Sequence, residues 1–334
     1  MPHLPPRLAS IYLTLAMTCA MASAQDGFDD GYRGGTIKGL PRPKKALHFL
    51  VVGDWGRVGE YRQRDVAEQM GRAAHTLEAE FVISTGDNFY PNGVASVHDP
   101  LWERSFEGVY TAHSLQEEWY PVLGNHDYRG NPDAQLAYAG ISRRWRMPAR
   151  YHFIERKASD GAKVLLIFLD TNPFEKKYYD DDKEPFRSNI RQRSDDTTRQ
   201  KEWLLNTLRS SDARWKFVIG HHPLYSSGKR RDETQSVASS LLPLLEKGGA
   251  DAYLCGHEHQ LEHDVFPSGL HQFISGAGSE VRPVGRADRA LFTASEAGFL
   301  AISAHMEAVN FTFINHEGRL MYGTRLEKPR QAGR

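Results

Sequence analysis

The sequence predicts an α/β fold, and three observations support this prediction. Short apolar runs rich in Val, Ile, Leu and Phe recur along the chain, and each ends in a polar turn that usually contains glycine. Patterns with helical spacing lie between some of these runs. Near the C-terminus, several apolar segments follow one another without an intervening helix. Alternating strands and helices are typical of α/β proteins, and consecutive strands indicate that part of the sheet is antiparallel.

The composition is that of an ordinary globular protein. The chain has 334 residues, of which 40% are hydrophobic and 25% are charged. This length suffices for one large domain or two small ones. With 42 basic and 42 acidic residues, the formal net charge is zero. A balanced charge does not favour a nucleic-acid-binding surface, so we expect no nucleic-acid partner. We also expect a monomeric chain.

The N-terminus has the features of a signal peptide over residues 1–24. Arg7 precedes the apolar segment LASIYLTLAMTCAMA, and the small residues Ala22 to Ala24 offer a cleavage site. The segment is shorter than the roughly 20 residues that a membrane span requires, so we expect cleavage and no stable membrane anchor. The protein is then secreted or periplasmic, although a lysosome-like compartment stays open. Cys255 is the only cysteine left after cleavage, which excludes an intramolecular disulfide.

The remaining chain divides into three parts. Residues 25–45 are rich in Gly, Pro, Arg and Lys and are predicted to form a linker or flexible arm. Residues 46–328 are predicted to form a single catalytic domain, followed by a tail at 329–334. Within the domain, the charged stretch at 175–196 is interpreted as a solvated surface loop.

Six apolar runs have the length of buried strands. In order, they are LHFLVV before GDWG, FVIST before GDNFY, WYPVL before GNHD, KVLLIFL before Asp170, WKFVI before GHHP, and DAYLC before GHEH. The later segments HQFIS, GFLAISA, AVNFTFIN and RLMYGTRL are predicted to be consecutive strands.

Three helices are predicted from apolar residues that recur on one face. These faces consist of Val66, Met70, Ala73 and Leu77 in the first helix; Trp203, Leu204 and Leu208 in the second; and Val237, Leu241, Leu244 and Leu245 in the third. The pair Gly248 and Gly249 then provides a helix stop.

Polar side chains gather where the predicted strands end. In α/β sheets, ligand groups collect beyond the carboxyl ends of strands. Five runs are followed by Asp, Asn or His within two residues, each introduced by glycine, so we expect these side chains to converge on one edge of one sheet. The set is Asp54, Asp87, Asn125, His126, His221, His222, His257 and His259.

Carboxylates and imidazoles together favour hard or borderline divalent and trivalent metals. Taken singly, the Asp and Asn residues are explained by turn formation after a strand. Together with four histidines at matching positions, metal ligation is the better explanation. The set exceeds what one tetrahedral site needs, so two metals that share a bridging Asp fit better. Such pairs clamp the attacking and leaving oxygens in phosphoryl displacement.

The ordered blocks GDWG, GDNFY, GNHD, VIGH and GHEH resemble the motifs of the calcineurin-like metallophosphoesterase superfamily. The version here is similar to the purple acid phosphatases, and especially to the small tartrate-resistant type. The similarity extends to LGNHDYRGNPDAQLAY, RRWRMPARYH and ISGAGS. It implies a four-layer α/β/β/α sandwich of mixed sheets, with helices on the outer faces and a dimetal site at the strand carboxyl ends.

The resemblance also implies a ligand set. Fe(III) would be held by Asp54, Asp87, Tyr90 and His259. A second, divalent metal (Fe, Zn or Mn) would be held by Asp87, Asn125, His221 and His257. Many superfamily members carry a His two residues after the first Asp, where this chain has Gly56. Tyr90 is interpreted as the replacement ligand, because a phenolate is a hard anionic donor that prefers Fe(III).

The activity implied is that of a secreted acid phosphatase, in which a metal-bound hydroxide attacks a phosphate monoester. The substrate would be a small phosphomonoester or a phosphoprotein. Asp87 and His126 would be catalytic, His126 as proton donor to the leaving group, while His222 and Asn125 would contact phosphate. Arg230 stands where mammalian relatives have a substrate-facing His. It either binds phosphate or belongs to a solvated basic turn.

Two other functions compete with this one. The first is a phosphodiesterase or nucleotide phosphoesterase on the same dimetal centre. The second is an iron redox protein with incidental phosphatase activity. The regulatory loop of mammalian members corresponds to residues 175–196 here, which gives the hypothesis that this segment covers the site.

Overall fold

Two mixed sheets pack face to face in the computed structural model, which describes residues 35–193, 196–285 and 288–328. The first sheet has six strands in the order β13-β12-β11-β1-β2-β3. Strands β1, β2 and β3 are parallel, whereas β11, β12 and β13 are antiparallel to their neighbours. Their bounds are β1 Leu47–Val52, β2 Phe81–Ser84, β3 Glu118–Pro121, β11 Gly298–Ala304, β12 Ala308–Asn315 and β13 Leu320–Glu327.

The second sheet has seven strands in the order β10-β8-β9-β7-β6-β5-β4. The central strands β5, β6, β7 and β9 are parallel, and β4, β8 and β10 pair antiparallel at the two sides. The strands are β4 His152–Lys157, β5 Lys163–Phe168, β6 Trp215–Ile219, β7 Ala252–Cys255, β8 Leu261–Val265, β9 His271–Ser275 and β10 Ala290–Ala294.

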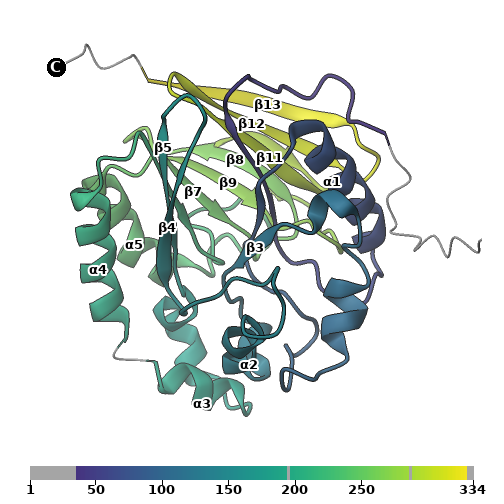
Figure 1. The fold of residues 1–334 in the computed structure, drawn as a ribbon. Coiled ribbons are helices and arrows are strands. Elements are labelled where there is room, and N and C mark those ends of the chain that lie inside the picture. The colour runs from purple at the N-terminus through teal and green to yellow at the C-terminus, as the bar shows by residue number, and fades with distance from the viewer. Residues whose placement is uncertain (1–34, 194–195, 286–287, 329–334) are drawn as a thin grey trace, which may run out of the picture.

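Helices cover the outer faces of both sheets (Figure 1). Helix α1 (Gln63–Leu77) packs on the six-stranded sheet, and α4 (Asp196–Ser210) and α5 (Gln235–Gly248) pack on the other. Shorter helical segments are η1 Trp102–Glu107, η2 His113–Leu115, η3 Asp127–Arg129, α2 Pro132–Tyr138, η4 Asn172–Phe174, η5 Lys176–Asp180 and α3 Phe186–Arg191. Three apolar cores result, one between the sheets and one under each helical layer.

The predicted α/β/β/α sandwich is confirmed. In α1, the residues of the predicted apolar face are fully buried because they recur at helical spacing. Helix α5 ends at Gly249, whose φ of 71° is the left-handed conformation that closes many helices. No helix in the described part of the chain is long and apolar enough to cross a bilayer.

Two strand predictions need correction. The segments of β11, β12 and β13 are consecutive antiparallel strands as expected, but HQFIS forms β9, which lies in the other sheet and pairs parallel to β7. Strand β8 was not predicted, because its sequence LEHDV lacks an apolar run. Glu262, His263 and Asp264 are nevertheless all buried there, held by side-chain hydrogen bonds such as that from the backbone N–H of Ser227 to Glu262.

Two segments that were predicted to be irregular and solvated pack against an apolar core. Within the predicted linker, Ile37 and Leu40 are buried in the core beside α1, so residues 35–45 are not a free arm. The described part of the predicted solvated loop at 175–196, residues 175–193 and 196, is packed instead, because Tyr178, Phe186 and Ile190 are buried in the same core. The predicted signal peptide, residues 25–34 and the tail lie outside the described residues.

Candidate metal centre

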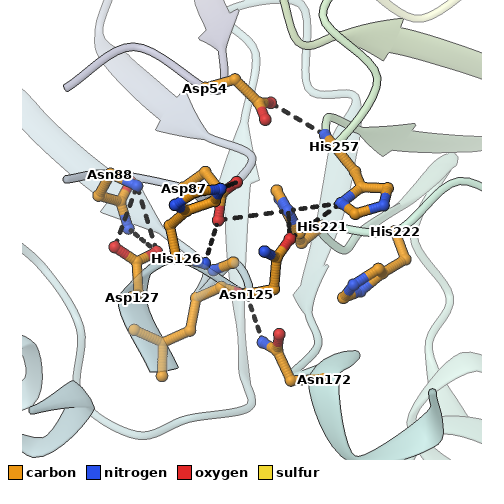
Figure 2. Close-up of polar contacts among 12 residues, drawn as sticks. Asp54, Asp87, Asn88, Asn125, His126, Asp127, Asn172, His221, His222 and His257 are labelled. Atoms are coloured by element: carbon orange, nitrogen blue, oxygen red, sulfur yellow. Dashed lines mark hydrogen bonds and ion pairs between the residues drawn. The ribbon is translucent and has the colours of Figure 1, made fainter. Parts of the chain in front are cut away.

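The polar residues predicted from the strand ends meet at one end of the sandwich (Figure 2). Asp54, Asp87 and Asn125 follow β1, β2 and β3 of one sheet, whereas His221 and His257 follow β6 and β7 of the other. The expectation of one edge of one sheet is therefore wrong. Packing the two sheets brings the carboxyl ends of their parallel strands together, and the His257 N–H donates to Oδ2 of Asp54 at 2.9 Å across this junction.

The backbone at three of these positions is left-handed. Asp54, Asp87 and His257 have φ values of 58°, 50° and 69°. Non-glycine residues adopt this conformation at a cost, and such positions concentrate at functional sites. The sharp turn directs each side chain back over the strand end.

The first donor group surrounds the hydroxyl of Tyr90. This oxygen lies 3.0 Å from Oδ1 of Asp54, 3.0 Å from Oδ2 of Asp87 and 3.1 Å from Nε2 of His259. All four side chains are buried. A hydroxyl has one hydrogen and can satisfy only one of these neighbours. The arrangement has more acceptors than protons, which is what a cation site requires.

The second donor group consists of Asn125, His221 and His257. Nδ1 of His257 lies 3.0 Å from Oδ1 of Asn125 and 3.3 Å from Nε2 of His221, and that Nε2 is 3.4 Å from the same amide oxygen. Two ring nitrogens and an amide oxygen thus face one another in a buried space. Their lone pairs repel unless protons or a cation lie between them.

Asp87 lies between the two groups. Its Oδ2 faces the Tyr90 hydroxyl, and its Oδ1 lies 3.5 Å from Nε2 of His221. Asp54, Asp87 and His221 place ligand atoms within 4.8 Å of one another, as do His221, His222 and His257. The donor chemistry and this geometry fit two metal ions that share one carboxylate.

Electrostatics favour the same conclusion. Burial, together with the nearby Asp87, raises the pKa of Asp54 to about 8. Burial and Asp54 raise the pKa of Tyr90 well above its usual value. Burial also opposes ionisation of Asp87, but the positive charges of His221 and His126 outweigh it and hold the pKa of Asp87 low. The protein alone therefore does not favour keeping both carboxylates and the phenol anionic, and cations bound here would supply the missing charge.

Comparison with known proteins gives the family. Residues 47–261 match the calcineurin-like phosphoesterase family. Purple acid phosphatase 17 of Arabidopsis thaliana is 43% identical over 239 residues, covering 70% of this chain and 69% of the relative. Human tartrate-resistant acid phosphatase type 5 is 32% identical over 307 residues, covering 86% and 92%. The chain belongs to the purple acid phosphatases. The predicted resemblance is confirmed, and so is the expectation of an acid phosphatase with a dimetal centre.

One solved structure with the same fold has a different description. It is titled "GAP50 the anchor in the inner membrane complex of Plasmodium" and is 25% identical to this phosphatase. The TM-score is 0.73, with 86% of this chain and 90% of that chain covered.

The structure explains why this purple acid phosphatase has glycine at position 56. A Cβ atom on Gly56 would collide with the backbone carbonyl of Asn88. The Tyr90 N–H donates to the carbonyl oxygen of Gly56 at 2.9 Å. The turn that carries Tyr90 therefore occupies the space in which a side chain at 56 would start, in agreement with the interpretation that Tyr90 replaces a ligand there.

His126 lies at the rim of the centre. Its ring centroid is 4.3 Å from that of Tyr90, and its Nε2 is 3.9 Å from Oδ2 of Asp87. Its Nδ1 lies 2.5 Å from the carbonyl oxygen of Pro91. A guanidinium nitrogen of Arg129 lies 3.0 Å from the same Nδ1 and 3.4 Å from Nε2, so the ring has an acceptor and a permanently charged donor beside it at the rim.

His222 is placed differently from its predicted role in phosphate binding. Its Nδ1 lies 2.8 Å from Oγ1 of Thr171, and its Nε2 lies 2.8 Å from the hydroxyl of Tyr178. The side chain is buried, and both ring nitrogens have protein partners. The structure thus leaves His222 no free nitrogen for phosphate. Tyr178 was missed because it stands in the charged stretch that was taken for a surface loop.

Arg230 lies half-buried beside the centre. Its backbone N–H donates to Oε1 of Glu258 at 2.9 Å, which fixes the chain next to His257 and His259. Within the described parts of the chain, its guanidinium group has no hydrogen bond or ion pair. Burial and the positive charges of neighbouring groups, among them Arg230, lower the pKa of His257.

Two further residues were not predicted. Arg57 lies over the ring of Tyr90, with its guanidinium carbon 3.8 Å from the ring centroid, and it pairs with Glu280. Neither residue is among the Asp, Asn and His residues that follow the predicted strands, so no sequence pattern singled them out.

Proposed function

We propose that this chain is a secreted acid phosphatase that hydrolyses phosphate monoesters at an Fe(III)–M(II) centre. The observation that carries the proposal is the position of the Tyr90 hydroxyl, within 3.1 Å of donor atoms from Asp54, Asp87 and His259. A phenolate among carboxylates is a hard anionic donor set, which suits a trivalent ion better than a divalent one.

The ligands divide between two sites. Fe(III) is assigned to Asp54, Asp87, Tyr90 and His259, and the divalent Fe, Zn or Mn to Asp87, Asn125, His221 and His257. When bound, the metal pair supplies Lewis-acid activation of water and neutralises charge on the phosphoryl group. Backbone contacts hold the donors in place, since Nδ1 of His221 lies 2.8 Å from the Thr85 carbonyl oxygen and Oδ1 of Asp87 accepts from the His126 N–H at 2.7 Å.

His126 is assigned as the proton donor to the leaving alkoxide. Its Nε2 is the ring nitrogen that lies 3.9 Å from Oδ2 of Asp87, whereas its Nδ1 is turned to the carbonyl oxygen of Pro91, so Nε2 is assigned the proton transfer. The tilted contact of its ring with that of Tyr90, at 4.3 Å between centroids, holds the proton donor next to the metal ligands. A histidine suits this role because its charge changes near neutral pH.

Substrate binding is assigned to Asn125 and Arg230. Arg230 offers a permanently charged, planar donor group at the rim, and a guanidinium is a good partner for phosphate oxygens. His222 is assigned a supporting role, since Thr171 and Tyr178 occupy its nitrogens. The substrates proposed are small phosphomonoesters or phosphoproteins, acted on by a monomeric, secreted or periplasmic protein.

A second candidate is a structural anchor that has the same fold. The likeness to GAP50, which is described as an anchor, favours it. The ligand set argues for catalysis, because buried carboxylates without cations are costly to keep. A phosphodiesterase on the same dimetal centre is a third candidate. The relative rates on a monoester and a diester substrate distinguish it from a phosphomonoesterase.

The test is turnover of nitrophenyl phosphate against bis-nitrophenyl phosphate by purified, metal-loaded protein. We expect the monoester to be hydrolysed faster, and Asp87→Asn to abolish turnover because neither metal keeps its shared ligand. Asp65→Asn, at an exposed position of α1, serves as the matched control. Faster diester turnover would favour the phosphodiesterase, and no turnover of either substrate would favour the anchor.

A further inference from the structure

We propose that Arg57 and Glu280 form a charged outer pair that positions Tyr90 and His259 and tunes the metal these two residues hold. The inference rests on the Fe(III) assignment of the proposed function. Arg57 and Glu280 contact ligands of only one of the two metal positions, and they are called the Arg57–Glu280 pair below.

The contacts form a continuous chain. The guanidinium carbon of Arg57 lies 3.8 Å from the centroid of the Tyr90 ring. One guanidinium nitrogen is 2.5 Å from Oε2 of Glu280, and this same oxygen is 3.7 Å from Nδ1 of His259. The side chain of Arg57 is 17% exposed and that of Glu280 is 35% exposed, so water screens this pair only in part.

The turn that follows β1 fixes Arg57. Its N–H donates to Oε1 of Gln63 at 3.0 Å, and the preceding Gly56 accepts the Tyr90 N–H at 2.9 Å. The turn that excludes a ligand at position 56 therefore delivers a cation to the face of the replacement ligand. The same turn thus sets the positions of both Arg57 and Tyr90.

Each member of the pair acts on one ligand. A guanidinium above an aromatic face attracts the electrons of the ring, and more strongly when the phenol is ionised. Glu280 faces the ring nitrogen of His259 that points away from Tyr90, the position in which a carboxylate orients a metal-bound imidazole. The distance of 3.7 Å is too long for a hydrogen bond, so Glu280 acts on the His259 ring through the negative charge of its carboxylate.

The other metal position has a different outer contact. Nδ1 of His221 meets the neutral carbonyl oxygen of Thr85 at 2.8 Å. Nε2 of His257 has no hydrogen-bond partner among the described residues, as is true of Nδ1 of His259, but no charged group pairs with Nε2 of His257 there. The charged pair is thus confined to the Tyr90 and His259 side, where it acts on the ion assigned as ferric.

Removing the charge of Arg57 and removing the charge of Glu280 should shift the absorption band and the reduction potential of the iron in opposite directions. In Arg57→Met, the phenolate electrons lose a neighbouring cation and rise in energy. The tyrosinate-to-Fe(III) charge-transfer band then moves to longer wavelength, and the iron reduction potential falls. In Glu280→Gln, a negative charge is lost and Arg57 is left unneutralised. The charge-transfer band then moves to shorter wavelength, and the iron reduction potential rises. The double variant lies between the two single variants.

The experiment compares visible spectra, redox titrations and metal content of the purified holoenzyme and its variants. We expect the opposite shifts above, with metal content showing that the site is retained in both variants. Arg57→Lys keeps the charge and restores the band position in large part. The control is Arg62→Met, which removes an exposed arginine that pairs with Asp65 at 3.1 Å, and it leaves all three readouts unchanged.

The outcomes separate the inference from the proposed function. A wild-type protein without a charge-transfer band overturns the ferric assignment and this inference with it. A wild-type band that stays in place in both Arg57→Met and Glu280→Gln overturns the inference alone. Shifts in the same direction in both variants show loosening of the site rather than electronic tuning, and they also overturn it.

Discussion

The hydroxyl of Tyr178 lies 2.8 Å from Nε2 of His222, so a segment far from the strand-end motifs contacts the metal centre. The ring centroids of His222 and His257 are 4.7 Å apart, so only the His222 side chain separates Tyr178 from the assigned metal ligand His257. Nearby contacts anchor the segment, including the ion pair of Lys177 with Glu233 at 2.7 Å. Tyr178 therefore packs directly behind the His222 and His257 pair.

Replacing Tyr178 tests whether its contact with His222 supports catalysis. In Tyr178→Phe, His222 loses the partner of one nitrogen, and we expect kcat/KM to fall roughly 5-fold, the equivalent of one hydrogen bond worth about 1 kcal/mol. The matched control is Tyr179→Phe, since the Tyr179 hydroxyl donates instead to the carbonyl oxygen of Pro173. Equal effects of the two substitutions in steady-state kinetics would show that Tyr178 does not act through His222.

Arg230 gives a second kinetic prediction. In Arg230→Met, phosphate loses a charged donor worth about 1.5–3 kcal/mol, so kcat/KM falls roughly 10–100-fold, mostly through a higher KM. The neighbouring Lys229 is exposed, and Lys229→Met should leave KM unchanged. If the two variants behave alike, Arg230 belongs to a solvated basic turn and not to the substrate site.

Gly56 gives a stability prediction. A methyl group at this position meets the backbone of Asn88 and Phe89, so Gly56→Ala must displace the turn that carries Tyr90. We expect a loss of about 1–3 kcal/mol in the free energy of unfolding, together with weaker metal binding. Gly140→Ala is the control, because its nearest neighbour would be 3.4 Å away. Denaturant titration and metal analysis measure both effects, and a fully stable Gly56→Ala protein would be inconsistent with this packing.

The titration of His152 should account for part of the loss of folding stability in acid. Its ring stacks on Phe168 at 4.6 Å, and burial lowers its pKa from 6.5 to about 4. Between these two values the unfolded chain binds the proton and the folded chain does not, so stability falls as the pH drops below 6.5. One pKa unit corresponds to about 1.4 kcal/mol, which gives a loss of up to ~3 kcal/mol by pH 4.5.

The substitution His152→Phe keeps the stacked ring and removes this titration. Urea midpoints at pH 7 and pH 4.5 should therefore differ less in His152→Phe than in the wild type. His98→Gln, at an exposed position, is the control and should behave as the wild type does. An unchanged difference in His152→Phe would mean that His152 does not contribute.

The sequence predicted much of the centre because the motifs lie directly after strands. Asp54, Asp87 and Asn125 are brought together as expected. The rule that ligands gather at strand carboxyl ends says which end of a strand is used, but not which sheet the strand joins, so the contribution of two sheets was not foreseen. Residues such as Tyr178 and Arg57 escaped prediction because their positions depend on tertiary packing and not on a local pattern.

The visible spectrum of the purified protein, recorded with metal analysis, tests the central claim most directly. The account predicts iron and a second metal in the protein, with a tyrosinate-to-Fe(III) charge-transfer band. This band disappears in Tyr90→Phe and persists in Tyr61→Phe, whose ring is exposed. An active but colourless enzyme that contains two zinc or two manganese ions would contradict the ferric assignment.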